Sequence, residues 1–186
     1  MKKKPTPITI WGGQLDDPPE YAMPIIRAIG LACLNWGRLE QHLQLTLVTV
    51  NKEEFDLTEF RETPATSFRL KIGLFKKWFV DDPRFAKYHA PAKRLVTSLK
   101  HGNRDRQLVF HSNLQRFEPG PPPKIALTVL RLKGENVIQE LAVWTEKDLL
   151  NFSANIHKLN TGLRMISNET LTPDFLRSLE SKPTRP

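Results

Sequence analysis

A long run of apolar residues at helical spacing constrains the fold of this chain more than any other feature of its sequence. From Pro24 to Val50, apolar residues recur at steps of three and four, which is the signature of an amphipathic helix. They are Ile25, Ile26, Ile29, Cys33, Trp36, Leu39, Leu43, Leu47 and Val50. The acidic, proline-containing segment Asp16–Glu20 predicts the start of this helix. Cys33, within the stripe, is expected to be a small buried hydrophobic side chain.

Three further segments show helical periodicity. The second helix has an apolar stripe formed by Phe68, Ile72, Phe75 and Phe79. The third is predicted from about Arg84 to Phe117, in one piece or two, and carries on one face Ala92, Leu95, Val96, Leu99, Phe110 and Leu114. The last follows a capping box of Thr145 and Asp148 and has an apolar seam of Leu149, Phe152, Ile156, Leu159, Leu163 and Ile166.

Between the third and last helices the period of the sequence changes. KIALTVLRLK and NVIQELAVW are rich in β-branched residues, alternate in part, and are separated by Gly134-Glu135, which predicts a β-hairpin. The expected fold is therefore mainly α: a bundle of about four to five helices with one β-hairpin inserted before the last long helix. We expect an N-terminal extension over residues 1–19, the bundle over 20–168 and a C-terminal tail over 169–186.

Composition narrows the classes of protein to which the chain can belong. With 186 residues it is long enough for one domain with a hydrophobic core. One cysteine excludes an intramolecular disulfide framework, and no histidine has metal-ligand spacing, so we expect no metal and no cofactor. The start, MKKKPTPITIWGG, lacks the apolar run of a signal peptide, and no run is long enough to span a membrane, which predicts a cytoplasmic protein. The net charge of +8 favours acidic partners such as nucleic acid.

The third helix has a polar interruption in its apolar stripe. At about 100° per residue, Asn103 and Arg106 fall in the same sector as the apolar side chains. Gln107, His111 and Arg104 follow around the flank of the helix. Burying a guanidinium without a partner is strongly unfavourable, so Arg106 is expected either to pair with an acid or to face a wet cleft.

Two interpretations of this polar patch are open from the residues alone. In the first, Arg106 forms a buried ion pair with Glu40 or Asp105 that stabilises the bundle, and His111 caps or packs. In the second, Arg106 holds a phosphate through two parallel hydrogen bonds, and His111 acts as a general acid or base, because imidazole titrates near neutral pH. Lys100, upstream on the same helix, belongs either to a solvated face or to a surface that binds RNA.

The segment from Arg106 to Ser112, RQLVFHS, resembles the Arg-x4-6-His motif of the HEPN superfamily, the higher eukaryotes and prokaryotes nucleotide-binding domains. WGRLE at 36–40 and the spacing Phe68-x2-Lys71-x3-Phe75 resemble the corresponding helices of bacterial members, so the likeness covers residues 20–168. HEPN domains are helical bundles that carry this motif late in a helix. The resemblance implies a site whose catalytic residues are Arg106 and His111, with supporting or nucleic-acid-binding roles for Asn103, Arg104, Gln107, Ser112 and Lys100.

The same resemblance implies two functions. Active HEPN proteins are metal-independent endoribonucleases that dimerise so that two Arg/His motifs face each other across a cleft, and the 2′-OH of the RNA is the nucleophile. For this chain that implies a homodimer acting on RNA or nucleotides in a toxin or defence system, with an antitoxin as a further partner. Other members have lost activity and serve as nucleotide-binding or scaffold proteins, in which the Arg/His pair is structural.

One position departs from the pattern of the family. Gln107 stands where Asn, Asp or His usually follows the motif arginine, which leaves open whether the site cuts. Arg104-Asp105 offers a second register that does have the polar follower and separates Arg104 from His111 by about two helical turns. Arg106 fits the shorter motif, and Arg104 stays as the alternative motif arginine.

Overall fold

The computed structural model describes residues 18–51, 67–133, 136–170 and 172. Within them, a short 3-10 turn (η1, Glu20–Ala22) leads into α1 (Met23–Asn51), which is followed by α3 (Phe68–Phe79), a second 3-10 turn (η2, Pro83–Tyr88) and α4 (His89–Phe110). Three strands follow, β1 (Asn113–Glu118), β2 (Lys124–Lys133) and β3 (Asn136–Thr145), and then α5 (Glu146–Thr170). The predicted mainly-α fold with a hairpin before the last helix is confirmed. The predicted extension up to residue 17 and the predicted tail from residue 173 lie outside the described residues.

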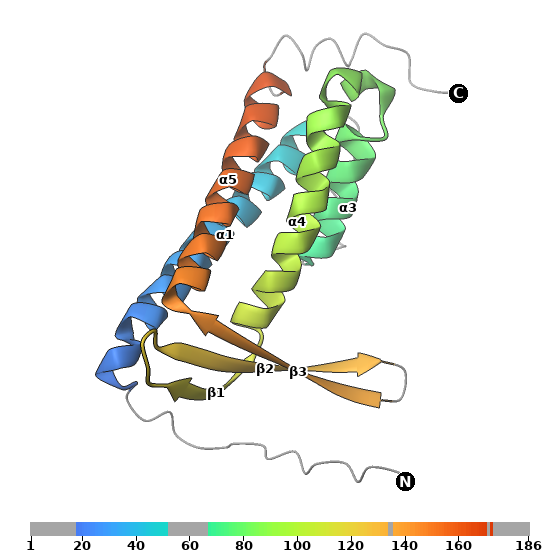
Figure 1. Cartoon of the computed structure of the whole chain (residues 1–186). Helices are drawn as coiled ribbons and strands as arrows, with labels where there is room; N and C mark the ends of the chain where they lie inside the picture. Colours follow the sequence, from blue (N-terminus) through green and yellow to red (C-terminus); the bar gives the residue numbers. More distant parts are fainter. Residues whose placement is uncertain (1–17, 52–66, 134–135, 171, 173–186) are drawn as a thin grey trace.

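The four helices pack into a bundle in which α1 lies along α5 and α3 lies along α4 (Figure 1). The core between them includes fully buried aromatic and aliphatic side chains: Phe75, Phe79, Phe85, Leu39, Leu43, Leu99, Ile156 and Leu163. Side chains cap the starts of two helices, α3 and α5. The Ser67 hydroxyl accepts from the backbone N–H of Leu70, and Thr145 and Asp148 form the expected reciprocal cap.

The buried stripe of α1 differs from the prediction in its first half. Ala28 and Ala32 are buried, whereas Cys33 is exposed, so the prediction of a buried cysteine is wrong. Small side chains at Ala28 and Ala32 carry the contact with the neighbouring helices. A pattern that weights large apolar residues places the stripe one position too far around the helix at this point.

The third helix ends earlier than the sequence predicts. α4 stops at Phe110, and residues 113–118 form β1, which pairs antiparallel with β2 at one edge of a sheet of order β1-β2-β3. A shift of register between Leu114 and Arg116 marks a β-bulge. Because of the bulge, Leu114 and Phe117 face the same side of the sheet although they are three residues apart. That spacing is also helical, and it led the sequence pattern to continue the helix.

An aromatic contact joins the sheet to the bundle. The ring of Phe152 on α5 lies 6.2 Å from the ring of Phe110 on α4 and 6.1 Å from that of Trp144 on β3, between ring centroids. Ile125 and Leu127 of β2 are buried on the same side of the sheet. The sheet therefore closes the end of the bundle at which α4 stops and α5 begins (Figure 1).

Gly73 gives a test of the helical assignment of α3. It lies in the middle of the helix, it is exposed, and a Cβ added there meets nothing within 4 Å. Gly73→Ala should raise the free energy of unfolding by about 0.5–1 kcal/mol, because alanine loses less backbone entropy on folding. Urea unfolding followed by circular dichroism measures this change.

Gly102→Ala is the matched control for this substitution. A Cβ at Gly102 of α4 would lie 3.4 Å from Cδ1 of Leu159 and 3.6 Å from Cζ3 of Trp36. The increase in the free energy of unfolding should therefore be smaller for Gly102→Ala than for Gly73→Ala. A fall in stability on Gly73→Ala would contradict the structure of α3.

Candidate functional site

The predicted polar patch lies on the C-terminal half of α4 and just beyond it, where the bundle meets the sheet. The structure divides its residues by burial. Asn103, Arg106 and Ser112 are half-buried, whereas the exposed members are Lys100, Arg104, Gln107 and His111. The patch therefore has an inner part that faces α1 and an outer part that faces solvent.

Arg106 lies against the first helix without an acidic partner. The centre of its guanidinium is 5.5 Å from the centroid of the Trp36 ring, which is the geometry of a cation–π contact. Within the described residues, Nε of Arg106 is buried and has no hydrogen-bond partner, and the same holds for Nε1 of Trp36 and Oδ1 of Asn103. This inner cluster of Trp36, Asn103 and Arg106 therefore combines two unpaired donors with one unpaired acceptor.

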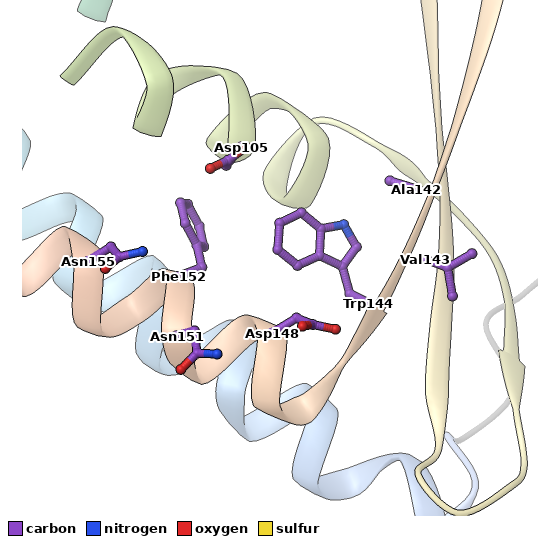
Figure 2. Close-up of a pocket in the computed structure, with 8 residues that line it drawn as sticks. All are labelled: Asp105, Ala142, Val143, Trp144, Asp148, Asn151, Phe152 and Asn155. Carbon is purple, nitrogen blue, oxygen red and sulfur yellow. The ribbon is translucent and has the colours of Figure 1, made fainter. Parts of the chain in front are cut away.

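The predicted ion pair of Arg106 with Glu40 is not formed. Glu40 pairs instead with Lys71 of α3, at 2.9 Å between Nζ and Oε1. Asp105 points away from Arg106, because adjacent residues on a helix lie about 100° apart. In Figure 2, Asp105 lines the pocket between α4 and α5.

The outer part of the patch brings Arg104 and His111 to one face. Seven residues correspond to nearly two full turns, so the two side chains lie within about 20° of each other around α4. His111 is the exposed C-cap of the helix, and its backbone N–H donates to the carbonyl of Gln107. Arg104 forms a 3.5 Å ion pair with Glu140 of β3. Arg106, by contrast, is about 140° from His111 around the helix axis.

The remaining predicted residues have local roles in the structure. The hydroxyl of Ser112 donates a hydrogen bond to the carbonyl of Leu108, which gives a partner to one of the carbonyls at the C-terminal end of α4. The side chains of Lys100 and Gln107 are exposed on the same half of the helix. These positions leave both side chains accessible to a ligand that approaches α4 from solvent.

A pocket of about 450 Å³ lies on the other side of α4, and the sequence patterns did not predict it. Its lining combines carboxylates, carboxamides and aromatic rings: Asp105, Ala142, Val143, Trp144, Asp148, Asn151, Phe152 and Asn155. Figure 2 shows α4 on one side, α5 on another and the end of β3 on the third. On α5, Asp148, Asn151 and Asn155 recur at steps of three and four on one face. That polar spacing is the signal from which the pocket could have been found.

The two carboxylates of this pocket differ in their environment. Burial raises the pKa of Asp105 above its ordinary value, and the positive charges of Arg104 and His101 offset part of the effect. Hydrogen bonds from the hydroxyl and the backbone N–H of Thr145 lower the pKa of Asp148. Asp148 is therefore committed to capping α5, whereas Asp105 is available to a ligand that donates a hydrogen bond.

The described residues contain no group of three or more His, Cys, Asp or Glu side chains placed to hold a metal ion. None of the helices in the described part of the chain is both long and apolar enough to cross a bilayer.

The two aspartates predict opposite effects of pH on stability. Asp105→Asn should raise the free energy of unfolding at pH 7 by less than about 1 kcal/mol, because the ionised carboxylate is favoured in the unfolded chain. The gain should disappear below about pH 4, where the carboxyl is protonated in both states. Asp148→Asn should instead lower stability at pH 7, and this loss should shrink as the pH falls through the lowered pKa.

Urea unfolding of both variants and the wild type between pH 3 and pH 7, in steps of about half a unit, measures these differences. Equal effects of the two substitutions at pH 7 would contradict the environments described above.

Comparison of the chain with protein-family models, with curated proteins and with solved structures finds no match. The resemblance to HEPN domains therefore stays a prediction from the sequence, based on the segment from Arg106 to Ser112 and on the patterns in α1 and α3.

Proposed function

We propose that this chain is a HEPN-like endoribonuclease that cleaves RNA without a metal ion, with Arg106 and His111 as its catalytic residues. The observation that carries the proposal is that Arg106, half-buried beside Trp36, has no acidic partner among the described residues. A cation in such a position is not compensated by an acid among the described residues, and a phosphate would supply the missing negative charge.

The exposure of His111 supports the same proposal. A general acid or base must reach the substrate, and His111 lies in solvent at the end of α4. In the proposed reaction the 2′-oxygen of a ribose attacks the adjacent phosphorus, its proton passes to a base, and the bond to the 5′-oxygen of the next nucleotide breaks. The products are a 2′,3′-cyclic phosphate and a 5′-hydroxyl, which needs a proton. His111 transfers one of these protons, while Arg106 or Arg104 neutralises the charge on the phosphate.

The setting of the proposed enzyme follows from the same likeness. It acts as a homodimer in the cytoplasm, in a toxin or defence system with an antitoxin partner. The net charge of +8 supports binding to RNA, and Lys100 and Gln107, which are exposed on α4, are accessible to it.

RNA cleavage in EDTA tests this function. Wild-type protein should cleave mixed RNA, and His111→Ala should lower the rate by about 100-fold or more, because proton transfer typically contributes 10²–10⁴-fold. His157→Ala, at an exposed position of α5, is the matched control and should leave the rate unchanged. Cleavage that survives His111→Ala, or an inactive wild type, would contradict the mechanism.

Arg104→Ala and Arg106→Ala, assayed side by side, identify the motif arginine. The substitution that removes cleavage while the protein stays folded marks the guanidinium that holds the phosphate. Arg164→Ala, at an exposed position of α5, controls for the general loss of a positive charge.

A second function, non-catalytic binding of RNA or nucleotides by a HEPN-like scaffold, is favoured by the contact between Arg106 and Trp36. If that contact is the role of Arg106, Arg106→Ala should lower the free energy of unfolding by about 0.5–2 kcal/mol. His111→Ala would then change neither stability nor RNA binding. Thermal unfolding of the two variants, together with RNA binding measured by fluorescence anisotropy, separates this function from the enzyme.

A further inference from the structure

The two edges of the sheet differ in how well they are protected against pairing with another strand. At one edge, β1 is short, contains a β-bulge and carries the ion pair of Arg116 with Glu118. At the other edge, β3 runs from Asn136 to Thr145 and pairs only with β2 within the described residues. It contains no proline, lysine or arginine. Apart from the charge of Glu140, which pairs with Arg104 of α4, the β3 edge lacks the usual devices that prevent edge-to-edge association.

The side chains near this edge are apolar and exposed. On the sheet face turned away from the bundle, Leu141 is 54% exposed, and Val137 and Val143 are exposed as well. Ile138, which points to the opposite face, is also exposed. An extended strand with large apolar side chains in solvent is the type of surface that a second strand covers in a sheet.

The pocket described above is lined in part by the end of this strand. Ala142, Val143 and Trp144 contribute to it together with residues of α4 and α5. It lies beside β3, between the strand and the two helices (Figure 2).

We infer that two copies of this chain associate by antiparallel pairing of β3 with β3, which forms a continuous six-stranded sheet around a two-fold axis. Residues opposite each other must point to the same face, so the residue numbers of each pair have an even sum. Two such registers give the longest overlap. One places Glu140 opposite Glu140 of the second copy, which is unfavourable, and the other places Leu141 opposite Leu141.

The register centred on Leu141 covers exposed apolar side chains of β3 and the pocket beside it. It places Gln139 opposite Val143 and Glu140 opposite Ala142 of the second copy. It also places Ile138 of one copy opposite Trp144 of the other, where its side chain covers the pocket. The negative charge of each Glu140 is offset by Arg104 of its own chain.

Pairing in this register brings the candidate sites of two copies together. Arg104 contacts Glu140, which lies next to the two-fold axis, so the C-terminal halves of both α4 helices lie on one face of the joined sheet. That the two copies share one catalytic site rests on the proposed function. The pairing of the two β3 strands does not depend on that function.

Disulfide crosslinking tests the register. In a Cys33→Ser background, which removes the exposed native thiol, Leu141→Cys should give a disulfide-linked dimer as the main species under mild oxidation on a non-reducing gel. Leu130→Cys is the matched control, because Leu130 is exposed on the adjacent strand β2 and should give no linked dimer. Leu34→Cys, exposed on α1, reports a dimer formed through the helices. No crosslink at Leu141, or an equal one at Leu34, would overturn the inference.

Light scattering of the full chain adds an independent measurement. The wild type should be a dimer, Leu141→Lys should associate about tenfold more weakly or worse, and Leu130→Lys should remain a dimer. Circular dichroism checks that both variants are folded. A monomeric wild type, or a dimer unaffected by Leu141→Lys, contradicts the pairing. Crosslinking at Leu141 without RNA cleavage supports the pairing and contradicts the proposed ribonuclease function. RNA cleavage without crosslinking supports the ribonuclease function and contradicts the pairing.

Discussion

The contact of Phe152 with Phe110 and Trp144 joins the end of the helical bundle to the sheet, where the candidate site lies. These three rings come from α5, α4 and β3, and their packing holds the sheet against the open end of the bundle. Because α4 ends within this contact, His111 is placed at the junction of helix and sheet and not along a helix surface. Aromatic rings bury more apolar area than other side chains, so a single cluster can hold two layers together.

Much of the fold follows from periodicity in the sequence, and the exceptions have identifiable causes. The long helices, the hairpin and the cap at Thr145 could be predicted because each depends on residues close together in the chain. β1 could not, since the bulge gives Leu114 and Phe117 a helical spacing inside a strand. The burial of Ala28 and Ala32 was also hidden, because small residues give a weak hydrophobic signal even where they carry a helix contact.

The candidate site was predicted in part for a similar reason. The break in the apolar stripe at Asn103 and Arg106 is a local pattern, and the structure finds both residues half-buried there. The partner of Arg106 depends on contacts between distant segments. Glu40 forms its ion pair with Lys71 of α3, and the guanidinium of Arg106 lies on the Trp36 ring instead. The pattern of residues along the sequence does not show which of the two cations pairs with Glu40. The pocket was missed because its lining is assembled from three separate elements.

The polar groups of the inner cluster reduce stability, and this is an argument about their role. A buried donor or acceptor without a hydrogen-bond partner lowers the free energy of unfolding by about 1–3 kcal/mol. The cation–π contact of Arg106 with Trp36 raises it by only about 0.5–2 kcal/mol. Leucine at either Asn103 or Arg106 would continue the stripe formed by Leu95 and Leu99 and avoid this loss. Residues that break a local rule without a compensating gain in the fold are typical of functional sites. The imbalance at Arg106 therefore supports an anionic ligand for this end of α4, and it argues against a purely structural role for the contact with Trp36.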